Sequence, residues 1–365
     1  MVDVGVIGAG MAGLVCARQL QQAGHRVVVV EKSRGLGGRV ATRRLEGSRA
    51  DHGLRYLENQ GTHTAELIRL GLEQGCLEPW TLPVYRWDQG TLRPPSATVE
   101  RYVAPGGMSA IAKVLGQGLE VWTNHRVVAI APSSNPSSNP SSDPSTNQRW
   151  HLSLEGGGDA PHTTLAVEAL AIAIPAPQAL DLLRPLADAG MAMDMVSRLD
   201  SVTFDPCITA IATYSPSVQT NVDELPWGAV EWDRSSEAGL AWVGIDSLKR
   251  PQPPYPVMVL QSSAAFANQH LESTDLPAVG QRLLDEAAPV LGQWVTTPTQ
   301  LQVHRWRYAF AQTPLSLPFL ASVDPLPLVC GGDWCGEHRL ESAMRSGEAM
   351  AEYLRQKLEA SLRLG

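Results

Sequence analysis

An apolar run followed by three spaced glycines constrains the fold of this chain more than any other feature. Residues 2 to 7 are rich in β-branched side chains and are predicted to form a buried parallel strand. Gly8, Gly10 and Gly13 then follow the G-x-G-x-x-G pattern, and residues 11 to 22 are predicted to form a helix. In such a turn the glycines permit a tight bend, a close approach of a pyrophosphate, and close packing of helix on strand. The segment therefore predicts a cradle for an adenine dinucleotide.

A second strand and an acidic residue complete this unit. Residues 26 to 30 are predicted to be a strand, and Glu31 follows it, 18 residues beyond Gly13. A carboxylate at this place accepts hydrogen bonds from the ribose hydroxyls of the adenosine, and the helix N-terminus favours the diphosphate. The non-glycine residues of this predicted site are Met11, Ala12, Glu31 and Lys32.

The composition narrows the class of protein. The length of 365 residues predicts two domains, and the net charge of −8 disfavours a nucleic-acid binder, which needs a broad basic surface. Five widely spaced cysteines fit a reducing cytoplasm, and the nine histidines show no paired spacing typical of a metal site. The sequence has no run of 18 uncharged apolar residues and no basic segment of a secretion signal, so we expect neither a membrane span nor export.

A second glycine cluster follows Glu31 and carries a resemblance to a known family. Gly35, Gly37 and Gly38 precede Arg39, whose guanidinium can bind a diphosphate through two hydrogen bonds. This G-G-R, with Glu31 before it and Asp51-His52-Gly53 after it, resembles the flavin amine-oxidase superfamily, and KSRGLGGRVATR and DHGLRYL are most similar to its renalase branch. The resemblance implies non-covalently bound FAD. It also implies an α/β (α+β) fold, in which a glutathione-reductase-like Rossmann FAD-binding domain carries an inserted mixed-sheet substrate domain.

The resemblance also assigns parts of the chain to two domains. The expected FAD-binding domain is discontinuous and comprises residues 1–78, 107–175 and 319–365, and the substrate domain comprises 79–106 and 176–318. Pro175 cannot continue a central strand, which favours a chain exit there. The cofactor residues that the resemblance implies beyond the first cradle are Gly38, Arg39, Gly53, Val127, Pro175, Gly332, Asp333, Glu341, Ser342 and Ala343.

Four residues are candidates for the substrate pocket. Tyr56 belongs to DHGLRYL, and Trp306 belongs to HRWRYA, a segment similar to the one that covers the substrate side of the flavin in renalases. Arg307 is a candidate phosphate partner, together with its neighbour Arg305. Arg55 stands where the renalase pattern has glutamine, and it either favours a phosphate-bearing ligand or pairs with a nearby acid.

The resemblance implies an oxidase that takes a hydride from isomeric dihydronicotinamide dinucleotides (2- or 6-dihydro-NAD(P)) and passes electrons to O2, giving hydrogen peroxide. The expected partners are this small dinucleotide and O2, without nucleic acid or membrane. An amine oxidase, a carotenoid-type desaturase and a non-catalytic flavin redox carrier are the alternatives. Amine oxidases typically hold a lysine and a water against the flavin. Of the four lysines in this chain, only Lys249, in a predicted turn, lies outside the FAD domain.

The low-complexity segment from 133 to 146 generates a first prediction. It repeats SSNP, SSNP and SSDP and offers no apolar side chain for a core. We expect that replacing it by a short turn leaves the flavin content and the activity of the purified protein unchanged. Loss of either, measured by flavin absorbance per chain and by turnover, would assign the repeat a function.

Overall fold

The computed structural model describes residues 2–88, 90–133, 149–158, 163–232 and 238–364, which form two compact units. Unit 1 comprises Met1–Gly38, Ala112–Thr203 and Ala311–Gly365, and unit 2 comprises Arg39–Ile111 and Phe204–Phe310. These units differ from the predicted domains, because residues 39–78 and 107–111 group with unit 2, and residues 176–203 and 311–318 group with unit 1. The division into an FAD-binding domain and a substrate domain stays a prediction.

Unit 1 is built on a mixed sheet with the strand order β10-β11-β12-β1-β2-β9. β1, β2, β9, β12 and β19 pair in parallel, whereas β10–β11–β12 and β18–β19 pair antiparallel. Val4 and Val6 of β1 are fully buried, as the apolar run predicts for a central strand. The strands are β1 (Val2–Ile7), β2 (Val27–Val30), β9 (Glu120–Trp122), β10 (His125–Pro132), β11 (Trp150–Gly156), β12 (Thr164–Ile172), β18 (Leu320–Ser322) and β19 (Leu328–Cys330).

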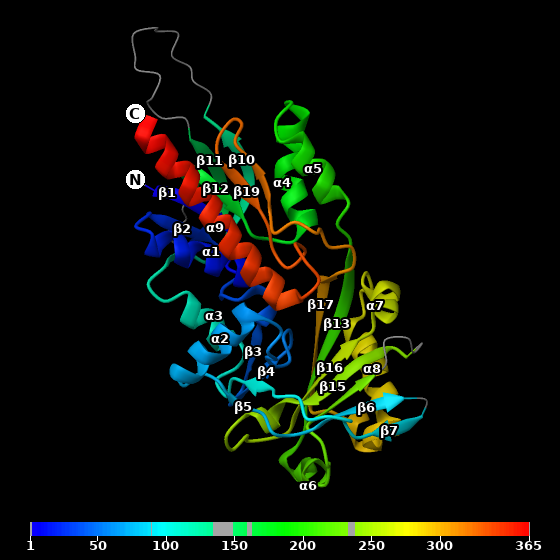
Figure 1. The fold of residues 1–365 in the computed structure, drawn as a ribbon. Coiled ribbons are helices and arrows are strands. Elements are labelled where there is room, and N and C mark those ends of the chain that lie inside the picture. The colour runs from blue at the N-terminus through cyan, green and yellow to red at the C-terminus, as the bar shows by residue number, and fades with distance from the viewer. Residues whose placement is uncertain (1, 89, 134–148, 159–162, 233–237, 365) are drawn as a thin grey trace. The chain divides into compact units, whose positions relative to one another are not determined.

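The first and last helices of the chain lie side by side in unit 1 (Figure 1). α1 (Met11–Gln22) has the predicted bounds, and α9 (Arg339–Leu364) packs along it. A methyl group on Gly347 would lie 2.3 Å from the carbonyl oxygen of Ala12, so glycine is what permits this close approach. α4 (Ala176–Asp188) and α5 (Met193–Asp200) pack on each other in the same unit.

Unit 2 is built on a second sheet with the order β17-β13-β16-β15-β14-β6-β7. α8 (Leu276–Leu291) buries Leu283 and Leu284 against the apolar residues of this sheet, and α7 (Ala264–His270) packs near β13. The strands are β6 (Val84–Asp88), β7 (Thr91–Arg93), β13 (Phe204–Thr213), β14 (Ala229–Trp232), β15 (Leu240–Ile245), β16 (Val257–Ser262) and β17 (Gln300–Ala311).

Smaller elements complete the description. α3 (Ser109–Leu115) follows a turn at Pro105 and Gly106. In unit 2, α2 (Thr62–Glu73) is a helix of 12 residues, α6 (Gln219–Asp223) follows the 3-10 turn η2 (Pro216–Val218), and η3 (Asp246–Lys249) follows β15. The remaining short elements are η1 (Gly38–Val40), β3 (Thr42–Leu45), β4 (Ser48–Asp51), β5 (Glu78–Pro79), β8 (Tyr102–Val103) and η4 (Gln293–Thr296).

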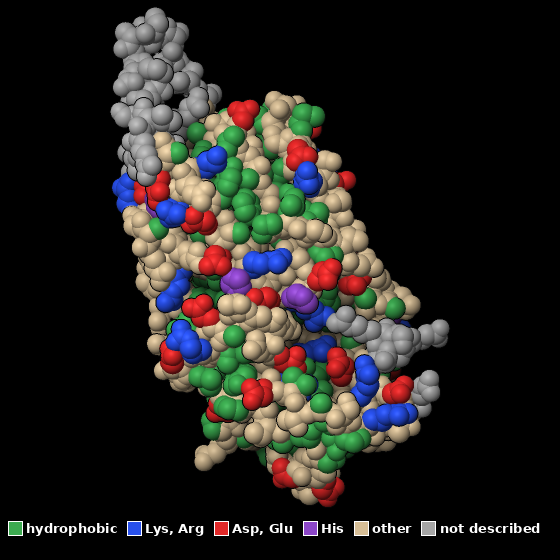
Figure 2. Space-filling model, in the orientation of Figure 1, with side chains coloured by type: hydrophobic (Ala, Val, Ile, Leu, Met, Phe, Trp, Pro, Cys, Tyr) green, Lys and Arg blue, Asp and Glu red, His purple; other side chains and the backbone are tan. Residues whose placement is uncertain are grey.

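The low-complexity segment lies between two strands that pair with each other. β10 and β11 pair antiparallel, with Pro132 opposite Trp150. Apart from Ser133, the predicted loop of residues 133 to 146 lies outside the described residues. In the part of the chain that is described, every helix is too short or too polar to cross a bilayer. Figure 2 shows acidic and basic side chains interspersed over the face in view.

Candidate functional site

The glycine turn of unit 1 has the geometry of a cradle. Gly8 has a φ of +102°, a left-handed conformation that favours glycine. A methyl group on Gly13 would lie 1.9 Å from the carbonyl oxygen of Gly8, so α1 packs directly on the turn. A methyl group on Gly10 would meet nothing within 4 Å, which leaves open space in front of this residue. The turn therefore excludes side chains where the protein packs and leaves room where a diphosphate would approach.

The helix that follows this turn presents an N-terminus suited to an anion. Gly10 is the N-cap of α1, and no side chain caps its first turn. The amide of Leu14 makes the helical bond to the Gly10 carbonyl at 2.9 Å, and Met11 and Ala12 are buried in the first turn. Free N–H groups and the helix dipole at such an end favour negative charge.

The second glycine cluster lies against the first. The amide of Gly37 donates to the carbonyl of Ala9 at 2.7 Å, and Gly10 and Gly37 form an isolated bridge. A methyl group on Gly38 would lie 3.5 Å from the Cα of Gly10. The structure therefore brings together the two glycine turns that the sequence separates by more than 20 residues.

Glu31 fixes the edge of the cradle. Its side chain is 7% exposed, and its Oε2 accepts from the amide of Ala9 at 2.8 Å while its Oε1 accepts from the amide of Ser33 at 2.7 Å. Each carboxylate oxygen has a further lone pair, which leaves acceptor capacity for a ribose hydroxyl. Lys32 is exposed and donates to Gln178 of α4 at 3.3 Å.

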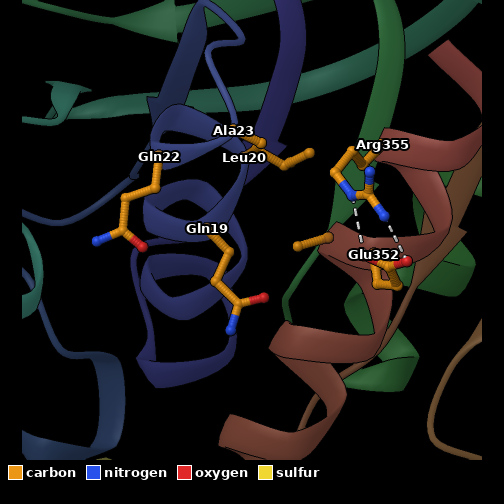
Figure 3. A pocket seen from close by; sticks show the side chains of 7 residues that line it. Gln19, Leu20, Gln22, Ala23, Glu352 and Arg355 are labelled. Carbon is orange, nitrogen blue, oxygen red and sulfur yellow. Dashed lines mark hydrogen bonds and ion pairs between the residues drawn. The ribbon is translucent and has the colours of Figure 1, made fainter. Parts of the chain in front are cut away.

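The cavity in Figure 3 is distinct from this cradle. It has a volume of about 290 Å³ and lies at the other end of α1, against α9. Its lining residues are Gln19, Leu20, Gln22, Ala23, Ala351, Glu352 and Arg355.

Further predicted cofactor residues lie in unit 1. The indole of Trp334 donates to the carbonyl of Ile174 at 3.1 Å, which ties the Gly332–Asp333 turn to the residue before Pro175. The amide of Gly332 donates to Ser346 of α9 at 3.0 Å. Glu341, Ser342 and Ala343 lie near the start of α9, and Val127 lies on β10, whose first amide, that of His125, donates to the Glu31 carbonyl at 3.0 Å.

Cys335 also lies in this part of unit 1. It is fully buried, and burial raises the pKa of its thiol to about 12. A neutral, buried thiol is a poor nucleophile, which agrees with a flavin that is not linked to Cys335.

In unit 2, side chains hold the backbone of residues 52 to 55. Thr209 and Trp306 donate to the carbonyl of His52 at 3.1 and 3.0 Å. Gln261 donates to the carbonyl of Gly53 at 2.8 Å, and Lys249 donates to the carbonyl of Arg55 at 2.7 Å. A methyl group on Gly53 would lie 2.0 Å from the carbonyl oxygen of Arg39, so this segment also packs tightly on the chain after the second glycine cluster.

A buried group of four charges lies beside this segment. Lys249 Nζ is 2.6 Å from Asp246 Oδ1 and 3.6 Å from Asp51 Oδ2, and Arg250 Nη2 is 2.8 and 2.6 Å from Oδ2 of the same two acids. All four side chains are at most 5% exposed. Burial raises the pKa of Asp246, but the charges of Lys249 and Arg250 outweigh it and hold that pKa below its usual value.

Two histidines and a tryptophan form a ring cluster in unit 2. The rings of His52 and Trp306 are stacked at 5.3 Å, and the ring of His304 meets them edge-on at 5.0 and 4.3 Å. Burial, with the neighbouring charge of Arg43, lowers the pKa of both histidines from 6.5 to about 4. Both imidazoles are therefore neutral at neutral pH.

The predicted substrate residues have protein partners. Arg55 donates to Gln261 at 2.6 Å, stacks over Trp242 at 4.4 Å, and lies 3.9 Å from Glu231. A nearby acid, which is one of the two partners expected for Arg55, is therefore present. Tyr56 packs its ring against Trp80 and Trp242.

The other arginines that are predicted to bind phosphate groups also contact protein groups. The exposed Arg307 pairs with Glu272 at 2.6 Å, and Arg305 donates to the Leu271 carbonyl at 2.9 Å. Arg39 donates to the carbonyls of Tyr308 and Ala309 at 3.3 and 3.1 Å. Phosphate binding by these arginines stays a prediction.

Sequence reasoning missed several residues of this arrangement. Gln261 was detectable as a polar residue within the apolar strand VMVLQS, and the acid and the bases of DSLKR were detectable by their helical spacing. His304 and Thr209 have no sequence signal, because only the sheet brings them to residue 52. Among the described residues, no group of three or more His, Cys, Asp or Glu side chains could hold a metal ion.

Comparison with known proteins gives two family matches. Residues 6–69 match the NAD(P)-binding Rossmann-like domain, and residues 86–355 match the family described as flavin containing amine oxidoreductase. The putrescine oxidase of Kocuria rosea is 33% identical over 116 residues, which cover 31% of this chain and 23% of that protein. The flavin-dependent L-tryptophan oxidase RebO of Lentzea aerocolonigenes is 43% identical over 82 residues, covering 21% of this chain and 17% of that protein. The alignments thus span less than a quarter of these relatives.

Solved structures extend the likeness over the whole fold. The cyclohexylamine oxidase of Brevibacterium oxydans has a TM-score of 0.68 at 14% identity, covering 98% of this chain and 99% of that one. At this identity the likeness concerns the fold alone. It confirms the predicted α/β (α+β) class, and the family matches confirm FAD as the cofactor and, at the level of the family, the class of FAD-dependent oxidoreductases. The cradle of unit 1 fits the ADP part of FAD.

The glycines of the cradle generate a prediction. Gly13→Ala forces a methyl group onto the Gly8 carbonyl. We therefore expect the free energy of unfolding to fall by about 1–3 kcal/mol and the protein to retain less FAD. Gly10→Ala has space and an ordinary φ of −74°, so we expect the fold to keep its stability while FAD affinity falls. Thermal unfolding of the apoprotein and FAD titration measure the two effects.

The exposed Gly35, which also has open space around it, supplies the matched control, and Gly35→Ala should change neither quantity. Unchanged FAD affinity in Gly10→Ala would contradict the assignment of the open space to the cofactor.

The histidine cluster generates a prediction on pH. The pKa of His52 is about 4 in the folded protein and about 6.5 when unfolded, so between these values the unfolded chain binds more protons. The stability that this group contributes is present above pH 6.5 and is lost as the pH falls toward 4. At about pH 5.5 we expect a loss of about 1 kcal/mol from His52.

Denaturant unfolding at pH 7 and at about pH 5.5 measures this loss. His52→Phe keeps a ring and should reduce the pH dependence, whereas His151→Phe, at an exposed position, should leave it unchanged. The same pH dependence in wild type and in His52→Phe would contradict the assignment.

Proposed function

Because the chain belongs to the family of flavin containing amine oxidoreductases, we propose that it is an FAD-dependent oxidase of isomeric dihydronicotinamide dinucleotides. Bound FAD supplies the hydride acceptor, and O2 takes up the electrons as hydrogen peroxide. In this proposal the cradle of unit 1 holds the ADP part of the cofactor, and residues 53 to 56 with Trp306 serve the flavin and the substrate. The remaining cofactor residues are those predicted from the sequence.

One observation carries the choice of substrate class. Lys249 is the only lysine in the sequence ranges of unit 2, and its ammonium is buried against Asp246 and the carbonyl of Arg55. An ammonium has three N–H donors, and Lys249 has a third oxygen, that of Asp51, within 3.6 Å. These contacts disfavour a role for Lys249 in holding a catalytic water. A dihydronicotinamide needs no such group, since its nitrogen lone pair already drives hydride loss.

The side chains around residues 52 to 56 support an aromatic substrate. Trp306 and Tyr56 are half-buried aromatic rings with flat apolar faces, whereas Trp242 is 2% exposed and lies under the guanidinium of Arg55, whose side chain is 20% exposed. Such faces suit a nicotinamide or an adenine ring. His52 and His304 are neutral at neutral pH, so they add no positive charge against a ring that loses a hydride.

An amine oxidase is the second candidate. The named relatives and neighbours, among them the putrescine oxidase and the cyclohexylamine oxidase, favour this function. Amine oxidases typically hold a lysine and a water at the flavin. An amine oxidase built on this chain would need another arrangement, because Lys249 is bound to Asp246.

Anaerobic reduction tests the two candidates. The purified holoenzyme is mixed with partly isomerised dihydronicotinamide dinucleotides, and in parallel with putrescine and cyclohexylamine. We expect the flavin absorbance to bleach in proportion to the minor isomers, with one flavin reduced per dinucleotide, and admission of air to restore it with one hydrogen peroxide per flavin.

Bleaching by the amines alone would establish the second candidate instead. A flavin that neither substrate class reduces would overturn both and would favour a redox carrier. Pure 1,4-dihydronicotinamide dinucleotide is the matched control and should bleach the flavin more slowly than the isomers.

A further inference from the structure

Three neighbouring residues form a row across the sheet of unit 2. Thr209 of β13 and Trp242 of β15 are both register partners of Gln261 on the central strand β16. Directly opposed residues of antiparallel strands place their side chains on the same face. All three are buried, with exposed fractions of 0%, 2% and 4% for Thr209, Trp242 and Gln261.

The chain from His52 to Tyr56 lies across this row. Thr209 bonds the carbonyl of His52, Gln261 bonds the carbonyl of Gly53, and Trp242 packs under the guanidinium of Arg55 at 4.4 Å. Successive residues of the segment therefore meet successive strands of the sheet. The segment has no regular strand pairing between residues 52 and 56, so these side chains take the place of a ladder.

Gln261 is the central member of this row and makes two bonds. Its Nε2 donates to the Gly53 carbonyl at 2.8 Å, and its Oε1 accepts from Nε of Arg55 at 2.6 Å. Rotating the amide by 180° would set its oxygen against a carbonyl and its nitrogen against a guanidinium, which fixes one orientation. One side chain thus couples the position of the Gly53 backbone to the position of the Arg55 guanidinium.

A second contact of Gly53 restrains the same segment. A methyl group at Gly53 would lie 2.0 Å from the Arg39 carbonyl oxygen, and the amide of Leu54 donates to that oxygen at 2.9 Å. The segment is held between the Arg39 carbonyl and the row. Gly53 is therefore restrained both by the backbone at Arg39 and by the hydrogen bond from Gln261.

We propose that Gln261 is a positioning residue, which sets Gly53 and Arg55 together in the place that catalysis requires. The inference rests on the proposed function for the part that Gly53 and Arg55 take at the flavin and the substrate. In this proposal Gln261 itself contacts neither the flavin nor the substrate. Misplacement of reacting groups by about 1 Å can lower a rate about a hundredfold, so loosening this segment should act on turnover.

Gln261→Leu tests the proposal in the holoenzyme. It removes both hydrogen bonds and keeps an apolar stem of similar length. We expect kcat to fall about 10- to 100-fold while KM changes less than about threefold. Independently of activity, hydrogen exchange of the peptide containing residues 52 to 57 should speed up, and the visible spectrum of the bound flavin should shift.

Thr209→Val is the matched control. It removes a buried side-chain donor from the same segment, but the His52 carbonyl keeps the Trp306 indole at 3.0 Å. We expect kcat and exchange within about twofold of wild type. Where Gln261→Leu fails to fold, Gln261→Glu keeps the acceptor for Arg55 and sets an oxygen against the Gly53 carbonyl, with the same expected signs.

Wild-type kcat and wild-type exchange in the folded Gln261 variant would overturn the proposal, and so would equal effects of the Gln261 and Thr209 variants. The exchange and spectral measurements need no substrate. Failure of the dihydronicotinamide isomers to reduce the wild type would therefore refute the proposed function and leave this test intact, with kcat then measured on whichever amine bleaches the flavin, or with exchange alone deciding.

Discussion

The contact between Gly13 and the carbonyl of Gly8 is the constraint on which the architecture of unit 1 depends. A methyl group on residue 13 would lie 1.9 Å from that carbonyl oxygen, so α1 can start at the turn only because position 13 is glycine, whereas position 8 requires glycine for its φ of +102°. This start aims the N-terminus of α1 at the space in front of Gly10, and Glu31 holds the same turn from the other side through the amide of Ala9. Close packing of the backbone thus creates the site, because it withholds side chains from the place where an anion is to lie.

In unit 2 the segment of residues 52 to 55 is held by hydrogen bonds to its buried polar groups. The carbonyls of His52, Gly53 and Arg55 belong to a segment that is neither helix nor strand. An unpaired buried carbonyl would cost about 1–3 kcal/mol of stability. Side chains from separate strands supply the donors. Lys249 can serve as one of them only because Asp246 and Asp51 neutralise its charge, with Arg250 balancing the second acid. The four buried charges therefore also help to hold the segment of residues 52 to 55, because Lys249 belongs to both.

The sequence predicted unit 1 better than unit 2 for a physical reason. The cradle is encoded locally, since Gly8, Gly13 and Glu31 belong to one strand–helix–strand segment, and α1 was predicted with its bounds. The hydrogen bond from Gln261 to Gly53 joins residues separated by about 200 positions, and a polar residue within an apolar strand does not by itself show which group it will meet. The motif DHGLRYL placed Arg55 and Tyr56 in a predicted substrate pocket, but it could not show that Arg55 and Trp306 form hydrogen bonds with protein groups.

Lys249 illustrates why loss of activity alone would misassign residues in such a site. Two acids and two bases are buried together with no net formal charge, and removing one member would leave an uncompensated charge at a cost of about 3–5 kcal/mol. A Lys249→Met variant would therefore lose function through instability whether or not the ammonium served catalysis. Removal of Gln261 buries no uncompensated charge of its own, because it is neutral and the Arg55 side chain is 20% exposed, so its cost is limited to the lost hydrogen bonds to Gly53 and Arg55. Positioning and catalytic roles in this unit are best separated at its uncharged members.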